Sequence, residues 1–150
     1  MISIAFTFST NDFEYVALTG NKTNPVLHSK GKILLPTNYD IPQTAAWFET
    51  ELDLLLNNIQ PDIVSYKLTI MKVTNDYVSN VFYGQAILNL LCHKKRIQIS
   101  NTSPASITAT KYSLPKGTNL TTYIGGLLGN QSAPWDKGIK TTALIALLYL

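Results

Sequence analysis

The stretch PDIVSYKLTI, residues 61–70, decides how the rest of the sequence is interpreted. Pro61 and Asp62 open it, and the β-branched, aromatic and aliphatic residues that follow are typical of a short, buried β-strand. Lys67 lies within this apolar run, where an ammonium group without a partner is costly to bury. Two interpretations stay open: Lys67 has a partner inside the protein, or its flexible stem carries the charge from the strand end to water.

Three further strands are predicted before this one, at residues 2–9, 13–20 and 26–36. Short turn sequences separate them, which favours an antiparallel meander. In the first strand the side chains alternate, so Ser3, Ala5 and Thr7 face one way while larger apolar residues face the other.

Helices and strands alternate through the rest of the chain. Asp40 and Gln43 have the spacing of a capping box and predict the start of a helix. The later pattern predicts a helix at about 76–93, a strand at 96–100 and helices at about 103–112, 121–129 and 135–149. Gly84 allows close packing of its helix, and Ser103 and Pro104 are typical of a helix start.

This order predicts an α/β protein. We expect a mixed five-stranded sheet, in which three antiparallel strands are followed by βα units, with helices on both faces. At 150 residues, one domain over 1–150 is expected. No run of about 18 apolar residues occurs, so no membrane span is expected. Cys92 is the single cysteine, which rules out an intrachain disulfide and favours a cytoplasmic location.

Charge is divided unevenly along the chain. Residues 1–76 carry five lysines against eight carboxylates, a net charge of −3, and residues 77–150 carry seven basic residues against Asp136 alone, a net charge of +6. A basic half can attract nucleic acid or another anionic partner. A solvated, lysine-rich surface would give the same composition. The chain has one arginine, Arg96, although arginine is the better reader of bases and phosphates.

Other candidate sites are weaker. His28 and His93 lie on different predicted elements without further ligands at metal-binding spacing, so no metal site is predicted there. Cys92 precedes three basic residues that could lower its pKa, but a packed core cysteine is the favoured interpretation. The GGLLGN stretch at 125–130 does not follow a strand and lacks the Gly-Lys-Ser/Thr ending of a phosphate loop.

The predicted order resembles the ribonuclease H-like fold. The chain is similar, more closely, to the RuvC-type Holliday-junction resolvases and to a small family of uncharacterised bacterial proteins predicted to be nucleases. Three stretches carry the resemblance: PDIVSYKL at 61–68, NTSPASITATKY at 101–112 and DKGIKTTALIALLYL at 136–150. They are similar to the family's fourth strand, its Ser-Pro-initiated helix and its last helix.

The resemblance implies a two-metal nuclease site, in which carboxylates hold two divalent cations that clamp a phosphodiester. The family places these acids on the first strand, the fourth strand and the last helix. In this sequence those positions fall on Thr7, on Lys67 and near Thr141 or Thr142, of which Thr141 is the expected one, while Asp136 is the one acid left near the last helix. Mg²⁺ would be expected only in an active site, so no cofactor is predicted.

A lysine at the fourth-strand position cannot bind Mg²⁺ while it is charged. We therefore interpret Lys67 as a replacement for the charge of the metal, paired with Asp136, in a site that has lost catalysis. The alternative is that Lys67 reaches solvent and has no role. A shift of the alignment by one residue would place Tyr66 there instead, which would not bind metal either.

Three functions remain as hypotheses. The first is a catalytically inactive nuclease-like protein that binds DNA or RNA, with a stripe of candidate lysines at Lys67, Lys111, Lys116, Lys137 and Lys140. The second is an active nuclease that uses Asp136 with Asp62, Asp12 or Glu14, although these acids are not expected to converge on one spot. The third is a protein-interaction or homodimeric scaffold without a nucleic-acid role.

Overall fold

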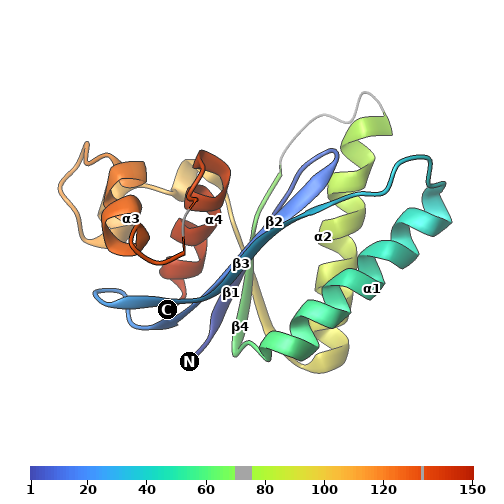
Figure 1. Cartoon of the computed structure of the whole chain (residues 1–150), viewed down its shortest axis with the longest axis horizontal. Coiled ribbons are helices and arrows are strands. Elements are labelled where there is room, and N and C mark those ends of the chain that lie inside the picture. Colours follow the sequence, from blue (N-terminus) through green and yellow to red (C-terminus); the bar gives the residue numbers. More distant parts are fainter. Residues whose placement is uncertain (70–75, 133) are drawn as a thin grey trace.

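A computed structural model describes residues 1–69, 76–132 and 134–150 (Figure 1). The strands are β1 (Ser3–Phe8), β2 (Asp12–Gly20), β3 (Pro25–Leu34), β4 (Ile63–Lys67) and β5 (Gln98–Thr102). The helices are α1 (Ile41–Ile59), α2 (Asp76–Lys95), α3 (Leu120–Leu128) and α4 (Lys137–Leu148), with two 3₁₀ turns, η1 (Pro104–Ser106) and η2 (Ala109–Tyr112).

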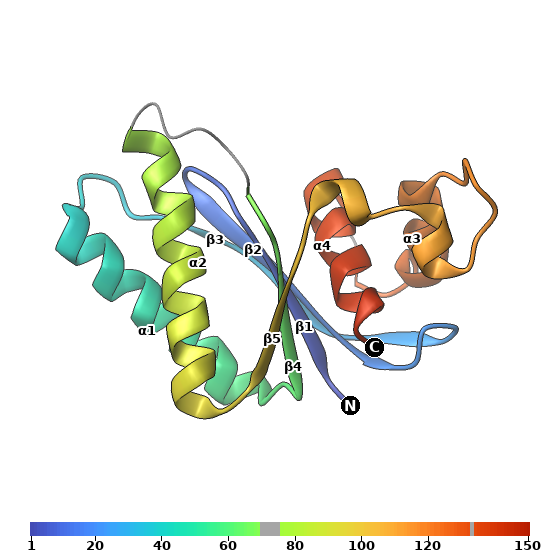
Figure 2. The same cartoon turned by 180° about the vertical axis from the view of Figure 1, so that it is seen from behind.

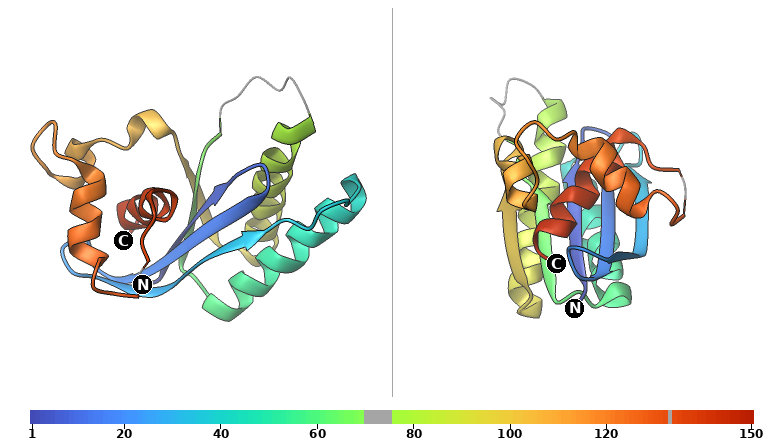
Figure 3. Two further views of the ribbon diagram at one scale, coloured as in Figure 1. Left: turned by 45° about the horizontal axis from the view of Figure 1, so that its top comes forward. Right: turned by 90° about the vertical axis from the view of Figure 1, so that its left-hand side faces the viewer.

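The five strands form one mixed sheet in the order β3-β2-β1-β4-β5. β1, β2 and β3 pair antiparallel, while β4 runs parallel to β1, and β5 runs parallel to β4. The sheet separates two helical layers, with α1 and α2 on one face and α3 and α4 on the other (Figures 1 and 2). In the right-hand view of Figure 3, α3 and α4 lie in front of the sheet and α2 behind it. The predicted fold class and sheet are confirmed.

The α1–α2 face is covered by an aromatic core. Phe8 and Phe13 pack against Phe48 of α1, with ring centroids 6.0 and 6.3 Å from that of Phe48, and Phe6 packs against both of them at 6.2 Å. Gly84 makes this packing possible, because a β-carbon there would clash with the ring of Phe8. The close approach predicted for Gly84 is therefore present.

The opposite face is covered by α4. The small side chain of Ala5 and the aliphatic side chains of Val16 and Leu18 pack against its buried residues. Ser3 also belongs to this face and donates a hydrogen bond of 2.8 Å to the carbonyl oxygen of Ala146. The predicted alternation of β1 is thus confirmed at Ser3 and Ala5.

The helix starts follow the sequence signals at α1 and α4. Asp40 and Gln43 form the predicted capping box on α1. The predicted helix over 103–112 is wrong, because the chain makes two separate 3₁₀ turns there and Ser103 makes no side-chain capping bond. The side chain of Ser106 instead donates to the carbonyl oxygen of Ser103, a local bond that competes with helix formation.

The edge of the sheet at β3 is tied to the segment before α4. The side-chain amide of Gln131 accepts from the Leu27 backbone N–H at 2.7 Å and donates to the Pro25 carbonyl at 3.2 Å. Lys30 donates to the carbonyl oxygen of Pro134 at 3.0 Å, and its ammonium lies 5.1 Å from the centre of the Trp135 ring. These contacts hold the N-terminal half of β3 against the α3–α4 layer.

Strand β4 ends at Lys67, and Ile70 of the predicted strand lies outside the described residues. Among the helices that the structure describes, none combines the length and the apolar character needed to cross a bilayer.

Candidate functional site

A row of polar residues crosses the α4 face of the sheet near the carboxyl ends of β1 and β4. Lys32 pairs with Glu14, Glu14 pairs with Thr7, and Lys67 pairs with Thr102. Thr7 and Lys67 each follow the paired residues Phe6 and Tyr66 in the parallel register of β1 and β4. All five strands of the sheet therefore contribute one polar residue to a continuous row, in which Glu14 lies beside Gly138 at the start of α4 and Thr102 lies beside Tyr149 just after its end.

Threonine side chains connect this row to α4. The hydroxyl groups of Thr7 and Thr142 lie 2.9 Å apart, and Thr142 donates to the Gly138 carbonyl oxygen at 3.1 Å. Because a hydroxyl has one proton and a carbonyl can only accept, the network is satisfied when Thr7 donates to Thr142. Thr142 is fully buried. Thr141, the position expected from the sequence, instead bonds the Lys137 carbonyl oxygen along its own helix, so it is not brought to Thr7.

Asp136 caps α4 and does not pair with Lys67. Its carboxylate accepts from the Ile139 backbone N–H at 2.9 Å, the geometry of an N-cap. The ion pairs of the structure do not include one between Lys67 and Asp136. The predicted pairing of Lys67 with Asp136 is therefore not present in the structure. Lys67 is half-buried at the strand end.

Glu14 is the residue that sequence reasoning undervalued. It is 6% exposed, and a β-carbon at Gly138 would come within 2.6 Å of its Oε2 atom. Burial raises the pKa of Glu14 and the Asp136 carboxylate raises it further, while the ammonium of Lys32 acts in the opposite direction. A signal was present in the sequence, because Glu14 is in phase with Val16 on the face of β2 that proves to be buried.

The ammonium of Lys32 lies between two carboxylates, 3.5 Å from Oδ2 of Asp12 and 3.7 Å from Oε1 of Glu14. Asp12 and Glu14 therefore share one ammonium group, and Glu14 also lies beside Gly138 at the start of α4. Asp62 does lie apart, at the other end of β4, where it accepts from the Ile2 backbone N–H.

The fold of this chain is similar to that of solved structures, although its sequence matches no known family. No protein-family model matches the sequence, and no curated protein matches it either. RuvC of Thermus thermophilus in complex with a Holliday junction substrate is 12% identical, with a TM-score of 0.78 over 99% of this chain and 91% of that chain. A second structure of Thermus thermophilus RuvC is 11% identical, with a TM-score of 0.79 over 99% and 92%. The yeast mitochondrial Holliday junction resolvase is 12% identical, with a TM-score of 0.74 over 97% and 76%.

The chain has a RuvC-like, ribonuclease H-like fold. The RuvC resemblance drawn from the sequence is thus confirmed at the level of the fold.

The residues of this RuvC-like domain do not fit the two-metal site that the resemblance implies. Thr7 and Thr142 supply hydroxyls, and Lys67 supplies an ammonium, whereas divalent cations of this type need several anionic oxygen ligands. Over residues 1–69, 76–132 and 134–150, no three His, Cys, Asp or Glu side chains come together as a metal site. The two carboxylates on β2, Asp12 and Glu14, share the ammonium of Lys32, which offsets one of their two negative charges.

The remaining candidate lysines belong to the same side of the RuvC-like fold. Lys111 lies in η2, Lys116 in the loop before α3, and Lys137 and Lys140 in α4. The first three are exposed, and Lys140 is half-buried with its ammonium beside Gly125 of α3. Residues 103–150 contain these four lysines and one carboxylate. The layer that covers the polar row is therefore basic.

Cys92 has no place in this site. It belongs to α2 on the opposite face of the sheet, where it is fully buried, and burial raises the pKa of its thiol to about 11. The interpretation of Cys92 as a core residue is confirmed.

Proposed function

We propose that this protein is a catalytically inactive RuvC-like protein that binds nucleic acid with the side of the sheet covered by α3 and α4. The observation that supports it most is the contact of Thr7 with Thr142 of α4, with Lys67 following on the neighbouring strand, at the positions that the family resemblance gives to metal-binding acids. The proposal is that the scaffold has been kept and its metal chemistry lost. Its proposed location is the cytoplasm, which suits the unpaired Cys92.

In this proposal the ammonium group of Lys67 replaces the positive charge of the missing metal ions. A metal in a nuclease site attracts the phosphate of the substrate, and an ammonium on the same strand end offers the same sign of charge without Lewis acidity. Lys111, Lys116, Lys137 and Lys140 would extend this attraction along the basic layer. Lysine contacts to phosphates favour binding that depends little on base sequence and strongly on salt.

The test combines binding and cleavage in one set of reactions. Labelled four-way junctions, duplexes and single strands of DNA and RNA are incubated with the protein at several salt concentrations, with Mg²⁺ and with Mn²⁺. The expected result is salt-sensitive binding without cleavage. Lys67→Ala should weaken duplex binding and reduce the slope of log K against log salt by about 0.9, the value for one phosphate contact.

Lys94→Ala is the matched control, because Lys94 is an exposed lysine at the end of α2 on the other side of the sheet. It should leave binding and its salt slope unchanged. Metal-dependent cleavage by the purified protein would overturn the claim of inactivity. Equal losses in the two variants, or no binding at low salt, would overturn the nucleic-acid claim.

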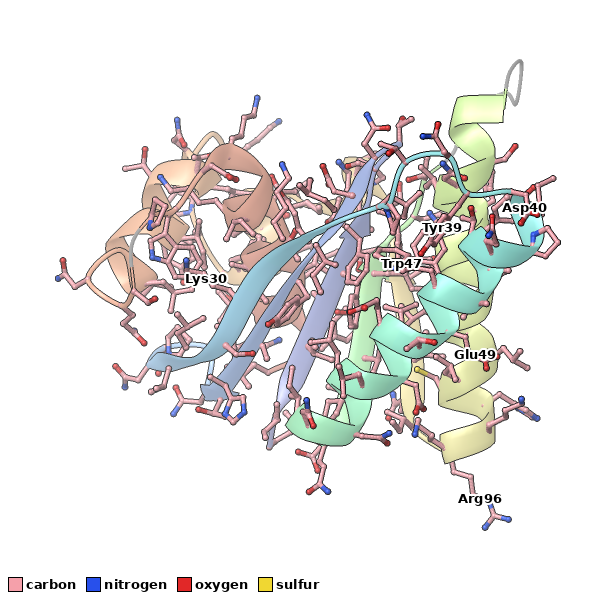
Figure 4. All side chains as sticks on the ribbon, turned by 45° about the vertical axis from the view of Figure 1, so that its right-hand side comes forward. Lys30, Tyr39, Asp40, Trp47, Glu49 and Arg96 are labelled. Atoms are coloured by element: carbon pink, nitrogen blue, oxygen red, sulfur yellow. The ribbon has the colours of Figure 1, made fainter. Side chains whose placement is uncertain are left out.

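A protein partner or a second copy of the chain is the other candidate function. The outer side of the α1–α2 layer exposes Ile41, Leu54 and Leu90 at 62%, 53% and 45%. Tyr39, just before α1, is 45% exposed and is labelled in Figure 4. Exposed apolar side chains on neighbouring helices favour a contact with another protein. Sedimentation of the purified chain over a range of concentrations would separate a homodimer from a monomer.

A further inference from the structure

A small cavity lies between the end of β5, the turn joining β2 and β3, and the last residues of the chain. Its volume is about 270 Å³, and it is lined by the polar residues Lys22, Asn101, Thr102, Ser106, Lys111 and Tyr149 together with Leu148. Lys22 comes from the β2–β3 turn and Lys111 from η2, so segments far apart in the sequence bring two ammonium groups to one cavity.

The polar groups around the cavity are held in place. The hydroxyls of Tyr149 and Thr102 lie 3.1 Å apart, and the Tyr149 hydroxyl also lies 3.4 Å from the Asn101 carbonyl oxygen. Thr102 is 4% exposed, so this pair is anchored in the sheet. The hydroxyl of Ser106 donates to the Ser103 carbonyl oxygen, which fixes it in η1.

The charge of the cavity has one sign. Its lining contains two lysines and no Asp or Glu. The ion pairs of the described residues use Lys32 and Lys95, and neither Lys22 nor Lys111 belongs to one. Two unneutralised ammonium groups beside fixed hydroxyls and an amide repel cations and attract anions.

We propose that this cavity binds one phosphate group, contributed either by a nucleic-acid backbone or by a free phosphate compound. A phosphate can accept charge-assisted bonds from Lys22 and Lys111 on separate oxygens, and the amide of Asn101 offers a further donor. The cavity is large enough for one such group. Thr102 also ends the polar row at β5, so a bound phosphate would lie next to the site proposed for nucleic acid. The backbone source rests on the proposed function, whereas the free source does not.

The test is a titration of the ¹⁵N-labelled full chain with sodium phosphate, followed by amide chemical shifts, with sodium chloride at matched ionic strength as the reference. The expected result is saturable shifts at Lys22, Ser106, Lys111 and Tyr149 that chloride does not produce. The double variant Lys22→Ala, Lys111→Ala should weaken phosphate binding by at least about tenfold, because it removes both charge-assisted bonds.

Lys94→Ala is the control, since Lys94 is exposed at the end of α2 on the other side of the sheet and does not line the cavity. Shifts that are absent at these amides, or that are the same in the double variant and in Lys94→Ala, would overturn the proposal. The replaced lysines are exposed, so each variant should fold, and the amide spectrum shows whether it does. A loss of phosphate binding can therefore be distinguished from a loss of folding.

A second arm distinguishes the source of the phosphate. A DNA duplex added to the phosphate-loaded protein should displace the ion and shift the same amides if the backbone is the ligand. If phosphate binds and the duplex does not compete, the cavity takes a free phosphate compound. The proposed nucleic-acid function is judged separately, by the binding assay with Lys67→Ala, so its failure and the failure of the phosphate site can be told apart.

Discussion

Glu14 is a charged residue that is buried on the face of the sheet covered by α4. Its carboxylate is buried beside the start of α4, and Lys32 is its ion-pair partner. The pKa of Glu14 is raised, so the folded protein holds this proton more tightly than the unfolded chain does. The contribution of Glu14 to stability is therefore complete below the unfolded pKa and is lost as the pH rises through the folded pKa.

Glu14→Gln should remove this pH dependence. The free energy of unfolding of the unmodified protein contains a fall that begins near pH 4.5, the ordinary value for this carboxyl, and the variant should lack that part of the fall. Urea unfolding at several pH values between 4 and 7 measures it. Glu49→Gln, at an exposed position of α1, is the control. If the free energy of unfolding changes with pH in the same way in the unmodified protein and in Glu14→Gln, Glu14 does not cause the fall.

Restoring the acids of the row should create a metal site. The triple variant Thr7→Asp, Lys67→Glu, Thr142→Asp places three carboxylates where two hydroxyls and an ammonium now lie, and it should gain measurable Mn²⁺ binding. Isothermal titration calorimetry with Mn²⁺ detects the gain. The control triple replaces Thr141 in place of Thr142, and it should not gain such binding because Thr142, and not Thr141, contacts Thr7.

A folded Thr142 triple variant that binds no Mn²⁺ would show that these positions do not form a metal-competent set. Circular dichroism of both triple variants establishes whether each is folded.

At the scale of single elements, the sequence predicts well where strands and helices occur. It predicts poorly which residues of a helix face the sheet. The strands and α1, α2 and α4 follow apolar patterns and caps that are local in the sequence. Thr141 and Thr142 differ by one residue, which is a rotation of about 100° around the helix, and only the packing of α4 decides which one meets Thr7. Residues 103–112 contain good start signals, yet side-chain bonds to the backbone divide them into two 3₁₀ turns.

The site was predictable to a similar degree. The alternation of β1 identified the face of Thr7, but the partner of Asp136 could not be identified from spacing, because the carboxylate could serve either a side chain or a helix start. Glu14 was visible only as one of several acids. Its importance depends on the position of α4 over β2, which is a long-range contact.

Gly84 and Gly126 give a matched test of helix packing. At Gly84 a β-carbon would meet the rings of Phe8 and Phe48, whereas at Gly126 nothing lies within 4 Å. Gly84→Ala should destabilise the protein by about 1–3 kcal/mol, because overpacking outweighs the gain in helix propensity. Gly126→Ala should stabilise it by about 0.5–1 kcal/mol. Urea unfolding of both variants measures the difference, and a stabilised Gly84→Ala would contradict the packing.

At the scale of the whole molecule, two cores share one sheet. The aromatic core lies under α1 and α2, and the aliphatic core lies under α3 and α4. The side chains of each strand alternate between the two cores, so neither can be disrupted without disturbing the sheet that supports the other. We therefore expect residues 1–150 to unfold as one cooperative unit.

The two tryptophans report on the two cores separately. Trp47 packs against the aromatic core and Trp135 against the aliphatic one. In the variants Trp47→Phe and Trp135→Phe, the remaining tryptophan should give a fluorescence transition in urea that coincides with the loss of circular dichroism in the same variant. An earlier transition for Trp135 alone would show that the α3–α4 layer unfolds first and that the chain is not one cooperative domain.

The contact of Gln131 with β3 has a consequence for the behaviour of the protein at high concentration. An outer strand with free backbone groups is a template on which a strand of another molecule can assemble, and such growth leads to aggregates. The amide of Gln131 occupies the Pro25 carbonyl and the Leu27 N–H in the way that a neighbouring strand would. A strand from another molecule would have to displace Gln131 before it could pair with β3 from that end. We therefore expect this uncharged side chain to hinder the edge-to-edge assembly that leads to fibres.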